Sequence, residues 1–345
     1  MLHTIRCLLL LLRLITILSV AAISAIGQDA APAGSFPSSF PSVAQQRRPD
    51  DLPDPATIKL GTELVSLRVT VTDRSGRTIE GLKKESFKIY EDKVEQPVSF
   101  FSDEDTPVSV AIVFDTSGSM SGSKIVHAKE ALARFIQTSH EQDEYFLISF
   151  GSRPQLLLDG VRDGQAVLDQ FSNVRPEGHT ALYDAVSLGI EKVSRGTCPK
   201  RAIMLISDGE DNHSRSSFDQ VRRRLQESDI AIYTIEIGGS SPSPKSRAIG
   251  GIIMDKLAAI SGGKSFWPGN AEKMDAAFEQ IALELRRQYS VGYLPSNFAP
   301  DGKWHRIKVT VTAPDESPRL VVRSREGYYA VKNQDDHRGR TGTRN

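Results

Sequence analysis

Short apolar runs alternate with longer amphipathic stretches through the central part of the chain. Four runs are nearly continuous in hydrophobic residues: VSVAIVF (108–114), YFLISF (145–150), RAIMLISD (201–208) and IAIYTIEIG (230–238). Such runs are typical of strands buried on both faces of a parallel sheet. The stretches between them carry apolar residues at helical spacing, as in 124–139 and 181–195. This alternation predicts an α/β domain over residues 107–287, an open, mainly parallel, doubly wound sheet with helices on both faces.

The two flanks of this region have a different pattern. ELVSLRVTVTD (63–73) and HRIKVTVTA (305–313) alternate apolar and polar residues, and the segments around them are rich in β-branched and aromatic residues and in turns. We expect a β-rich, sandwich-like unit in which residues 288–331 pair with residues 59–106, with the α/β domain inserted between them. The pattern leaves open whether the flanks form one sandwich or two small pieces.

The two ends of the chain are predicted to lie outside the folded part. Residues 1–27 combine an early Arg6 with a long apolar run and small residues near its end, which indicates a signal peptide. Arg13 interrupts the apolar run, and a retained membrane anchor is the alternative. Residues 28–58 form a Pro- and Ser-rich flexible linker, and residues 332–345 a polar, disordered tail. The protein is therefore expected to be exported to the periplasm, the cell surface or the medium.

Composition narrows the possible partners. The 345 residues include 43 basic and 43 acidic side chains, so no net field attracts nucleic acid, and we expect no nucleic-acid partner. A membrane partner is expected only if the N-terminal segment is retained. Once the signal is removed, Cys198 is the one remaining cysteine, which leaves no pair for an intrachain disulfide.

Candidate chemistry gathers where three of the predicted strands end. Asp115, Ser117 and Ser119 follow the first strand at two-residue spacing, Thr180 stands at the start of a predicted helix, and Asp208 ends the run RAIMLISD. In open α/β sheets, ligands bind in the crevice beyond the carboxyl ends of the strands. The two carboxylates and three hydroxyls are therefore expected to share one rim.

All five side chains offer hard oxygen donors, which suit Mg²⁺ or Mn²⁺. With only two anionic ligands, the ion would keep a coordination position for a carboxylate of a partner protein. This chemistry is metal-bridged binding, and it requires no enzymatic reaction.

At these residues the sequence resembles the von Willebrand factor type A family, whose metal-ion-dependent adhesion site reads Asp-x-Ser-x-Ser, then Thr, then Asp. The resemblance implies that Ser117, Ser119 and Thr180 ligate the ion directly, and that Asp115 and Asp208 do so directly or through water. It also implies cell adhesion or another protein–protein interaction. The flanking segments look like a group of secreted bacterial proteins described as VWFA-related, acidobacterial type.

Other interpretations of the same residues remain. Asp115 and its serines are also suited to capping the helix near Lys124. Ser121 and Lys124 form an S-x-x-K, as in exported acyl-transfer enzymes, although no S-D-N or K-T-G string follows. A metal-assisted hydrolase and a scaffold stabilised by the metal are further alternatives. Glu210 and Asp211 are interpreted as solvated loop acids, with the alternative that one of them tunes the site.

Overall fold

The computed structural model describes residues 64–120, 122–175, 178–237, 244–297, 300–312 and 319–330, without the side chains of residues 119, 123 and 244–247. The predicted signal peptide, linker and C-terminal tail lie outside these residues. Within the described part, none of the helices is both long and apolar enough to span a membrane.

A six-stranded sheet forms the centre of the α/β domain. Its strand order is β10-β9-β8-β5-β6-β7, and every neighbouring pair is parallel except β6 and β7. The strands are β5 (Val108–Asp115), β6 (Glu144–Phe150), β7 (Pro154–Val161), β8 (Lys200–Ser207), β9 (Ala231–Glu236) and β10 (Lys264–Phe266). The predicted mainly parallel α/β sheet is confirmed. The antiparallel edge strand β7 was not predicted, because its residues are only half-buried and form no continuous apolar run.

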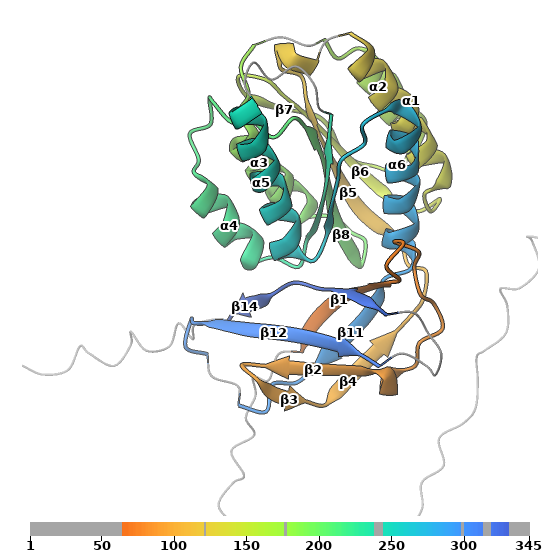
Figure 1. Ribbon diagram of the computed structural model, residues 1–345, viewed down its shortest axis with the longest axis vertical. Helices are drawn as coiled ribbons and strands as arrows, with labels where there is room; N and C mark the ends of the chain where they lie inside the picture. Colours follow the sequence, from red (N-terminus) through yellow and green to blue (C-terminus); the bar gives the residue numbers. More distant parts are fainter. Residues whose placement is uncertain are drawn as a thin grey trace, which may run out of the picture. The chain divides into compact units, whose positions relative to one another are not determined.

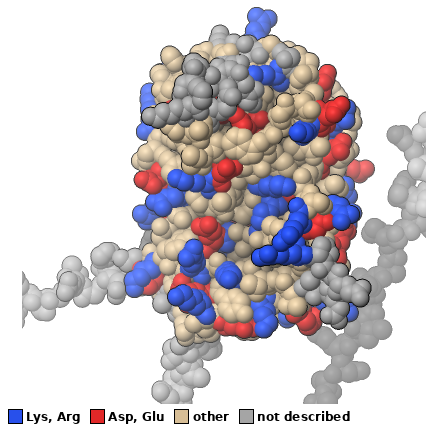
Figure 2. All heavy atoms as spheres, viewed as in Figure 1, with Lys and Arg blue, Asp and Glu red and all other residues tan. Residues whose placement is uncertain are grey.

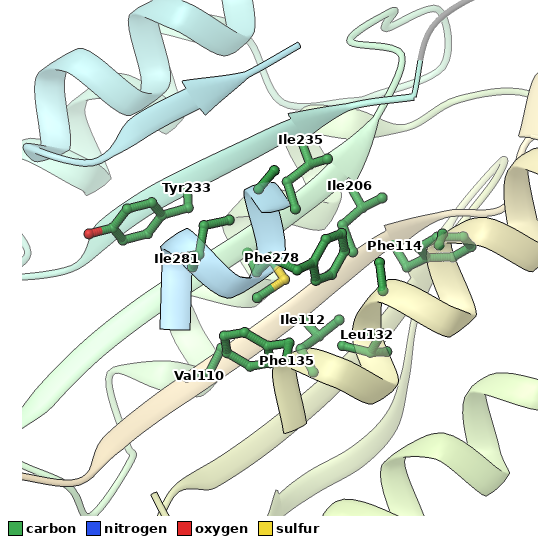
Figure 3. Packing of buried hydrophobic residues seen from close by; sticks show 14 of the residues in the cluster. Val110, Ile112, Phe114, Leu132, Phe135, Ile206, Tyr233, Ile235, Phe278 and Ile281 are labelled. Atoms are coloured by element: carbon green, nitrogen blue, oxygen red, sulfur yellow. The ribbon is translucent and has the colours of Figure 1, made fainter. Parts of the chain in front are cut away.

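Helices cover both faces of this sheet (Figure 1). One face carries α1 (Ser123–Thr138), α2 (Gly164–Ser172) and α6 (Ala271–Arg286), and the other carries α3 (Leu182–Val193), α4 (Phe218–Gln226) and α5 (Pro244–Ser261). In Figure 3, Leu132 and Phe135 of α1 lie by Val110 and Ile112 of β5, whereas Phe278 and Ile281 of α6 lie toward Ile235 and Tyr233 of β9; all belong to one hydrophobic cluster. Burial on both sides explains why β5 is apolar almost throughout.

The position of β5 determines where polar loops meet. β5 lies between β6 and β8. After β5 the chain first adds β6 along one edge of this strand, and it later adds β8 along the opposite edge. This reversal is the kind of switch point at which open α/β sheets bind ligands. Asp115, its last residue, therefore lies beside the loop that follows β8.

Two four-stranded antiparallel sheets make up the β-rich unit, in the orders β13-β1-β11-β4 and β14-β12-β2-β3. The strands are β1 (Val65–Thr72), β2 (Phe87–Glu91), β3 (Val94–Gln96), β4 (Val98–Ser102), β11 (Tyr289–Tyr293), β12 (Trp304–Val311), β13 (Val321–Arg323) and β14 (Gly327–Tyr329). Inward side chains of both sheets share one hydrophobic core, in which Leu67 and Val69 of β1 meet Ile307 and Val309 of β12. The N- and C-terminal flanks thus form one two-sheet unit.

A buried ion pair joins this unit to helix α6. Glu284 of α6 is fully buried, and its Oε2 lies 2.6 Å from Nη2 of Arg323 on β13. Arg323 also donates to the carbonyl of Gly263 at 3.0 Å, and Nε2 of Gln280 donates to Oε1 of Glu284 at 3.0 Å. A buried carboxylate of this kind is strongly destabilising once its partner is removed.

Acidic and basic side chains are both spread over the face in Figure 2, in keeping with the balanced charge of the chain. Exposed ion pairs on such a surface contribute little to stability. Arg195 and Glu191, 3.0 Å apart with side chains 69% and 50% exposed, are an example.

We predict that Arg323→Ala lowers the free energy of unfolding by about 3 kcal/mol, because Glu284 then keeps a buried charge without its guanidinium partner. The matched control, Arg195→Ala, is expected to change it by less than about 0.5 kcal/mol. Urea unfolding followed by circular dichroism measures both. Equal effects of the two substitutions would contradict the role given to the Glu284–Arg323 pair.

Candidate cation-binding site

The first loop of the candidate site begins at Asp115, which is fully buried at the end of β5. Its Oδ1 accepts a hydrogen bond from the backbone N–H of Ser117 at 2.8 Å, and its Oδ2 accepts one from the Ser207 hydroxyl at 2.6 Å. An Asp that binds the N–H two residues on turns the chain sharply. This turn ends the strand and brings Ser117, also buried, to the rim.

Thr180 belongs to the second loop, immediately before α3, and is buried. Its N–H donates to Oδ1 of Asn212 at 2.9 Å, and its carbonyl accepts from the N–H groups of Asn212 and His213 at 3.0 and 3.1 Å. These bonds tie the second loop to the third.

Asp208 opens the third loop directly after β8 and is also buried. Its Oδ1 accepts a long hydrogen bond, 3.3 Å, from the N–H of Glu210. Gly209 between them has φ +80°, and a Cβ there would lie 2.6 Å from the carbonyl oxygen of Gly250 in α5. Glycine is therefore required for the loop to pass so close to the helix.

The loops thus bring Asp115, Ser117, Thr180 and Asp208 to one edge of the sheet. The first two loops are also linked to each other, because Gly118 N–H donates to the carbonyl of Gly178 at 3.4 Å. The backbone of Ser119 lies in a single 3₁₀ turn, Gly118–Met120, and its side chain lies outside the described part of the chain.

Burial raises the pKa of Asp115 to about 6, and the nearby charge of Asp208 contributes in the same direction. Hydrogen bonds from Ser207 and Ser117 act against this shift. The ionised form is therefore unfavourable here without a positive charge. The surrounding groups are carboxylate and hydroxyl oxygens, which are the ligands that Mg²⁺ and Mn²⁺ prefer. The donor set fits a hard divalent cation.

Some residues of this region were missed or misread from the sequence. Ser207 and Asn212 were not identified, because the direction of their side chains depends on loops far apart in the chain. The interpretation of Asp211 as a solvated acid was wrong. It is half-buried, and it accepts hydrogen bonds from the N–H groups of Tyr183 at 3.1 Å and Ser214 at 3.4 Å.

A cavity of roughly 730 Å³ lies beside the rim. Part of its wall is formed by Thr116, which follows Asp115, and by Gly178, which lies two residues before Thr180. The exposed side chains of Arg153 and Arg175 also line it and give this part of the surface positive charge.

Residues 110–210 match the family model of the von Willebrand factor type A domain. The chain is 31% identical over 234 residues to an uncharacterized protein of Synechocystis sp., a match that covers 66% of this chain and 53% of that protein. It is 22% identical over 208 residues to the inter-alpha-trypsin inhibitor heavy chain H4 of Sus scrofa, covering 55% of this chain and 22% of that protein. The chain thus spans about half of the first relative and about a fifth of the second.

The chain also has similarity to two solved structures. A von Willebrand factor type A structure from Catenulispora acidiphila has a TM-score of 0.46 and 12% identity, covering 80% of this chain and 76% of that one. The vWF domain of the type V pili tip protein Mfa5 from Porphyromonas gingivalis has a TM-score of 0.43 and 14% identity, covering 52% and 95%.

The raised pKa of Asp115 predicts a pH dependence for the protein in EDTA. Because the folded-state pKa, about 6, lies above the ordinary 3.8, the folded state binds the proton more tightly. The Asp115 contribution therefore stabilises the fold as the pH falls through 6, and this stabilisation is lost as the pH rises through 6.

Between pH 7.5 and pH 5, wild type should gain about 1 kcal/mol relative to Asp115→Asn, which cannot take up this proton. Chemical unfolding of both proteins at the two pH values measures the difference. A difference that does not change with pH would show that Asp115 is not the buried acid described here.

Proposed function

This chain carries a von Willebrand factor type A domain, and we propose on that basis that it is an exported protein that binds a protein partner through a divalent cation. The observation that carries the proposal is the meeting of Asp115, Ser117, Thr180 and Asp208 at the carboxyl edge of the sheet. Ser119 would complete the set, as its place in the motif implies. The cation would be Mg²⁺ or Mn²⁺, supplying positive charge to these oxygens and one position to the partner.

Electrostatics supports the binding of a cation. Asp115 and Asp208 are both buried, and the charge of Asp208 raises the pKa of Asp115. A divalent ion between oxygens of this kind removes the cost of holding two like charges together. The hydrogen bonds to Asp115 and Thr180 hold these groups in place before the ion arrives, which reduces the entropic cost of binding.

The surroundings of the site favour an acidic partner. A carboxylate from the partner is a hard oxygen ligand and matches the remaining coordination position. Arg153 and Arg175 in the neighbouring cavity would attract further negative charge on the same segment. We therefore propose a protein ligand with an exposed Asp or Glu, flanked by acidic or polar residues.

We also propose that the protein is not an enzyme. Both carboxylate oxygens of Asp115 already accept hydrogen bonds, and the side chain is fully buried. Binding a cation through these oxygens requires no proton transfer to or from a substrate. The acyl-transfer alternative depends on Ser121, which lies outside the described residues.

Divalent cations should stabilise the folded protein. After EDTA treatment, Mg²⁺ or Mn²⁺ at 100 times its dissociation constant is expected to add about 2.7 kcal/mol of stability by mass action. The double variant Asp115→Ala, Ser117→Ala should show no such increase. Asp219→Ala, an exposed acid of α4, is the matched control and should respond as wild type. Thermal unfolding with and without cation measures the effect, and equal shifts in all three proteins would contradict the site.

Binding is tested with acidic peptides. Peptide arrays containing single Asp or Glu residues should retain the protein in Mn²⁺ and release it in EDTA, and Ser117→Ala should lose this retention while staying folded. If Ser117→Ala instead loses its fold together with binding, the metal serves as a structural element and the scaffold alternative is favoured. Retention that is equally strong in EDTA would contradict metal-bridged binding.

A further inference from the structure

A second group of ligand-type side chains lies in the β-rich unit. Glu91 is the last residue of β2, Asp92 begins the turn to β3, and His305 lies on β12. One ligand atom from each of the three lies within 4.8 Å of the other two. In particular, Nδ1 of His305 is 2.9 Å from Oδ2 of Asp92 and 3.4 Å from Oε1 of Glu91.

Neighbouring groups hold both carboxylates in position. The Glu91 side chain is only 8% exposed, and its Oε2 accepts a hydrogen bond of 2.5 Å from the hydroxyl of Tyr293 on the facing sheet. Asp92 has a left-handed backbone, φ 47°, and its Oδ1 accepts from the N–H of Arg306 at 2.9 Å. The cluster is therefore built into the end of the two-sheet core.

The other ring nitrogen of His305 supplies an independent observation. Nε2 is buried and has no hydrogen-bond partner. It lies 3.6 Å from Oδ1 of Asp301, so a third carboxylate faces the opposite side of the ring.

The tautomer of His305 decides which ring nitrogen donates a hydrogen bond and which presents a lone pair. When the proton is on Nδ1, the lone pair of Nε2 faces Asp301. When the proton is on Nε2, the lone pair of Nδ1 faces Asp92 and Glu91. Either arrangement leaves one lone pair of the ring facing a carboxylate, on a His305 side chain that is only 15% exposed. The arrangement is satisfied when a positive charge lies at Nδ1 and the proton stays on Nε2, facing Asp301.

We propose that Glu91, Asp92 and His305 bind a divalent transition-metal ion of the zinc class. Ligand bonds of 2.0–2.2 Å in a tetrahedron place neighbouring ligand atoms about 3.4 Å apart. The Nδ1–Oε1 separation, 3.4 Å, matches that edge length. The Nδ1–Oδ2 separation, 2.9 Å, is a hydrogen-bond distance and would lengthen by about 0.5 Å when both atoms bind one ion. An imidazole with two carboxylates suits Zn²⁺ better than Mg²⁺, and water would be the fourth ligand.

Groups around the cluster correspond to the outer shell of a metal site. A ligating histidine usually directs its second nitrogen to a carboxylate. Asp301 is the carboxylate on that side of the ring, with Oδ1 at 3.6 Å from Nε2 and held by the N–H of Lys303 at 2.8 Å. The Tyr293 hydroxyl orients the Glu91 carboxylate from the facing sheet. The metal would thus fix the β2–β3 turn against β12 at the end of the core. This site does not depend on the cation site of the α/β domain or on its proposed function.

Zinc binding to the metal-free protein at pH 7.5 tests the proposal. Equilibrium dialysis with Zn²⁺, read by atomic emission, should show one equivalent that binds at least 10-fold more weakly in His305→Asn. Asp92→Asn should give the same loss, and it keeps the fold because Asp92 is 52% exposed and Asn tolerates a left-handed backbone. Asp301→Asn should weaken binding by about 10-fold, as expected of an outer partner.

Two controls separate this site from other zinc-binding groups. His127→Asn, which removes a histidine from α1, and the double variant Asp115→Ala, Ser117→Ala should both retain the equivalent. The proposal is overturned if wild type takes up no zinc at micromolar concentration. It is also overturned if His305→Asn and Asp92→Asn bind zinc as wild type does.

Discussion

The buried carboxylate of Asp115 is the constraint on which the candidate site depends. A carboxylate can be buried at the end of a central strand only if its oxygens are occupied. The Ser117 N–H and the Ser207 hydroxyl do this, and each bond has a structural consequence. The first turns the chain out of β5, and the second joins the ends of β5 and β8. The geometry of the rim thus follows from the burial of one side chain.

The sheet and the loops have separate roles in this arrangement. The sheet fixes where the strands end, since β5 lies between β6 and β8 and is covered by helices on both faces. The loops then bind one another through backbone groups, as Thr180 does with Asn212. Gly209 allows the third loop to pass against α5 without a side chain in between. Groups held in this way need little reorganisation to bind a ligand.

The sequence was informative where one local pattern determines the outcome. Continuous apolar runs predicted the buried parallel strands, and the position of Asp115 at the end of one of them predicted its place on the rim. Local patterns failed where the decisive contact is distant in the chain. Ser207 donates a hydrogen bond to Asp115 although the two are 92 residues apart in the sequence. Glu91 and His305 come together only because β2 and β12 pair in the β-rich unit. Strand β7 was missed because an edge strand that is half-exposed has no distinctive apolar run.

Buried carboxylates are stabilised in different ways in this protein, and the difference bears on function. Glu284 is paired with a guanidinium, so its charge is already balanced by the chain. Glu144 accepts hydrogen bonds from Ser109 and from the backbone of Thr197, which shows that a buried acid can be satisfied without a cation.

Asp115 and Glu91 each have a second carboxylate close by, Asp208 in one case and Asp92 in the other. Hydroxyl and phenol groups orient these acids, but they cannot neutralise two like charges. The rim of the α/β domain and the Glu91–Asp92 cluster therefore share one feature, a pair of neighbouring carboxylates, although they lie in different parts of the fold. Their side chains differ, since one place offers oxygen alone and the other adds imidazole. We therefore expect the two places to select different metals, a hard ion in the α/β domain and a zinc-class ion in the β-rich unit.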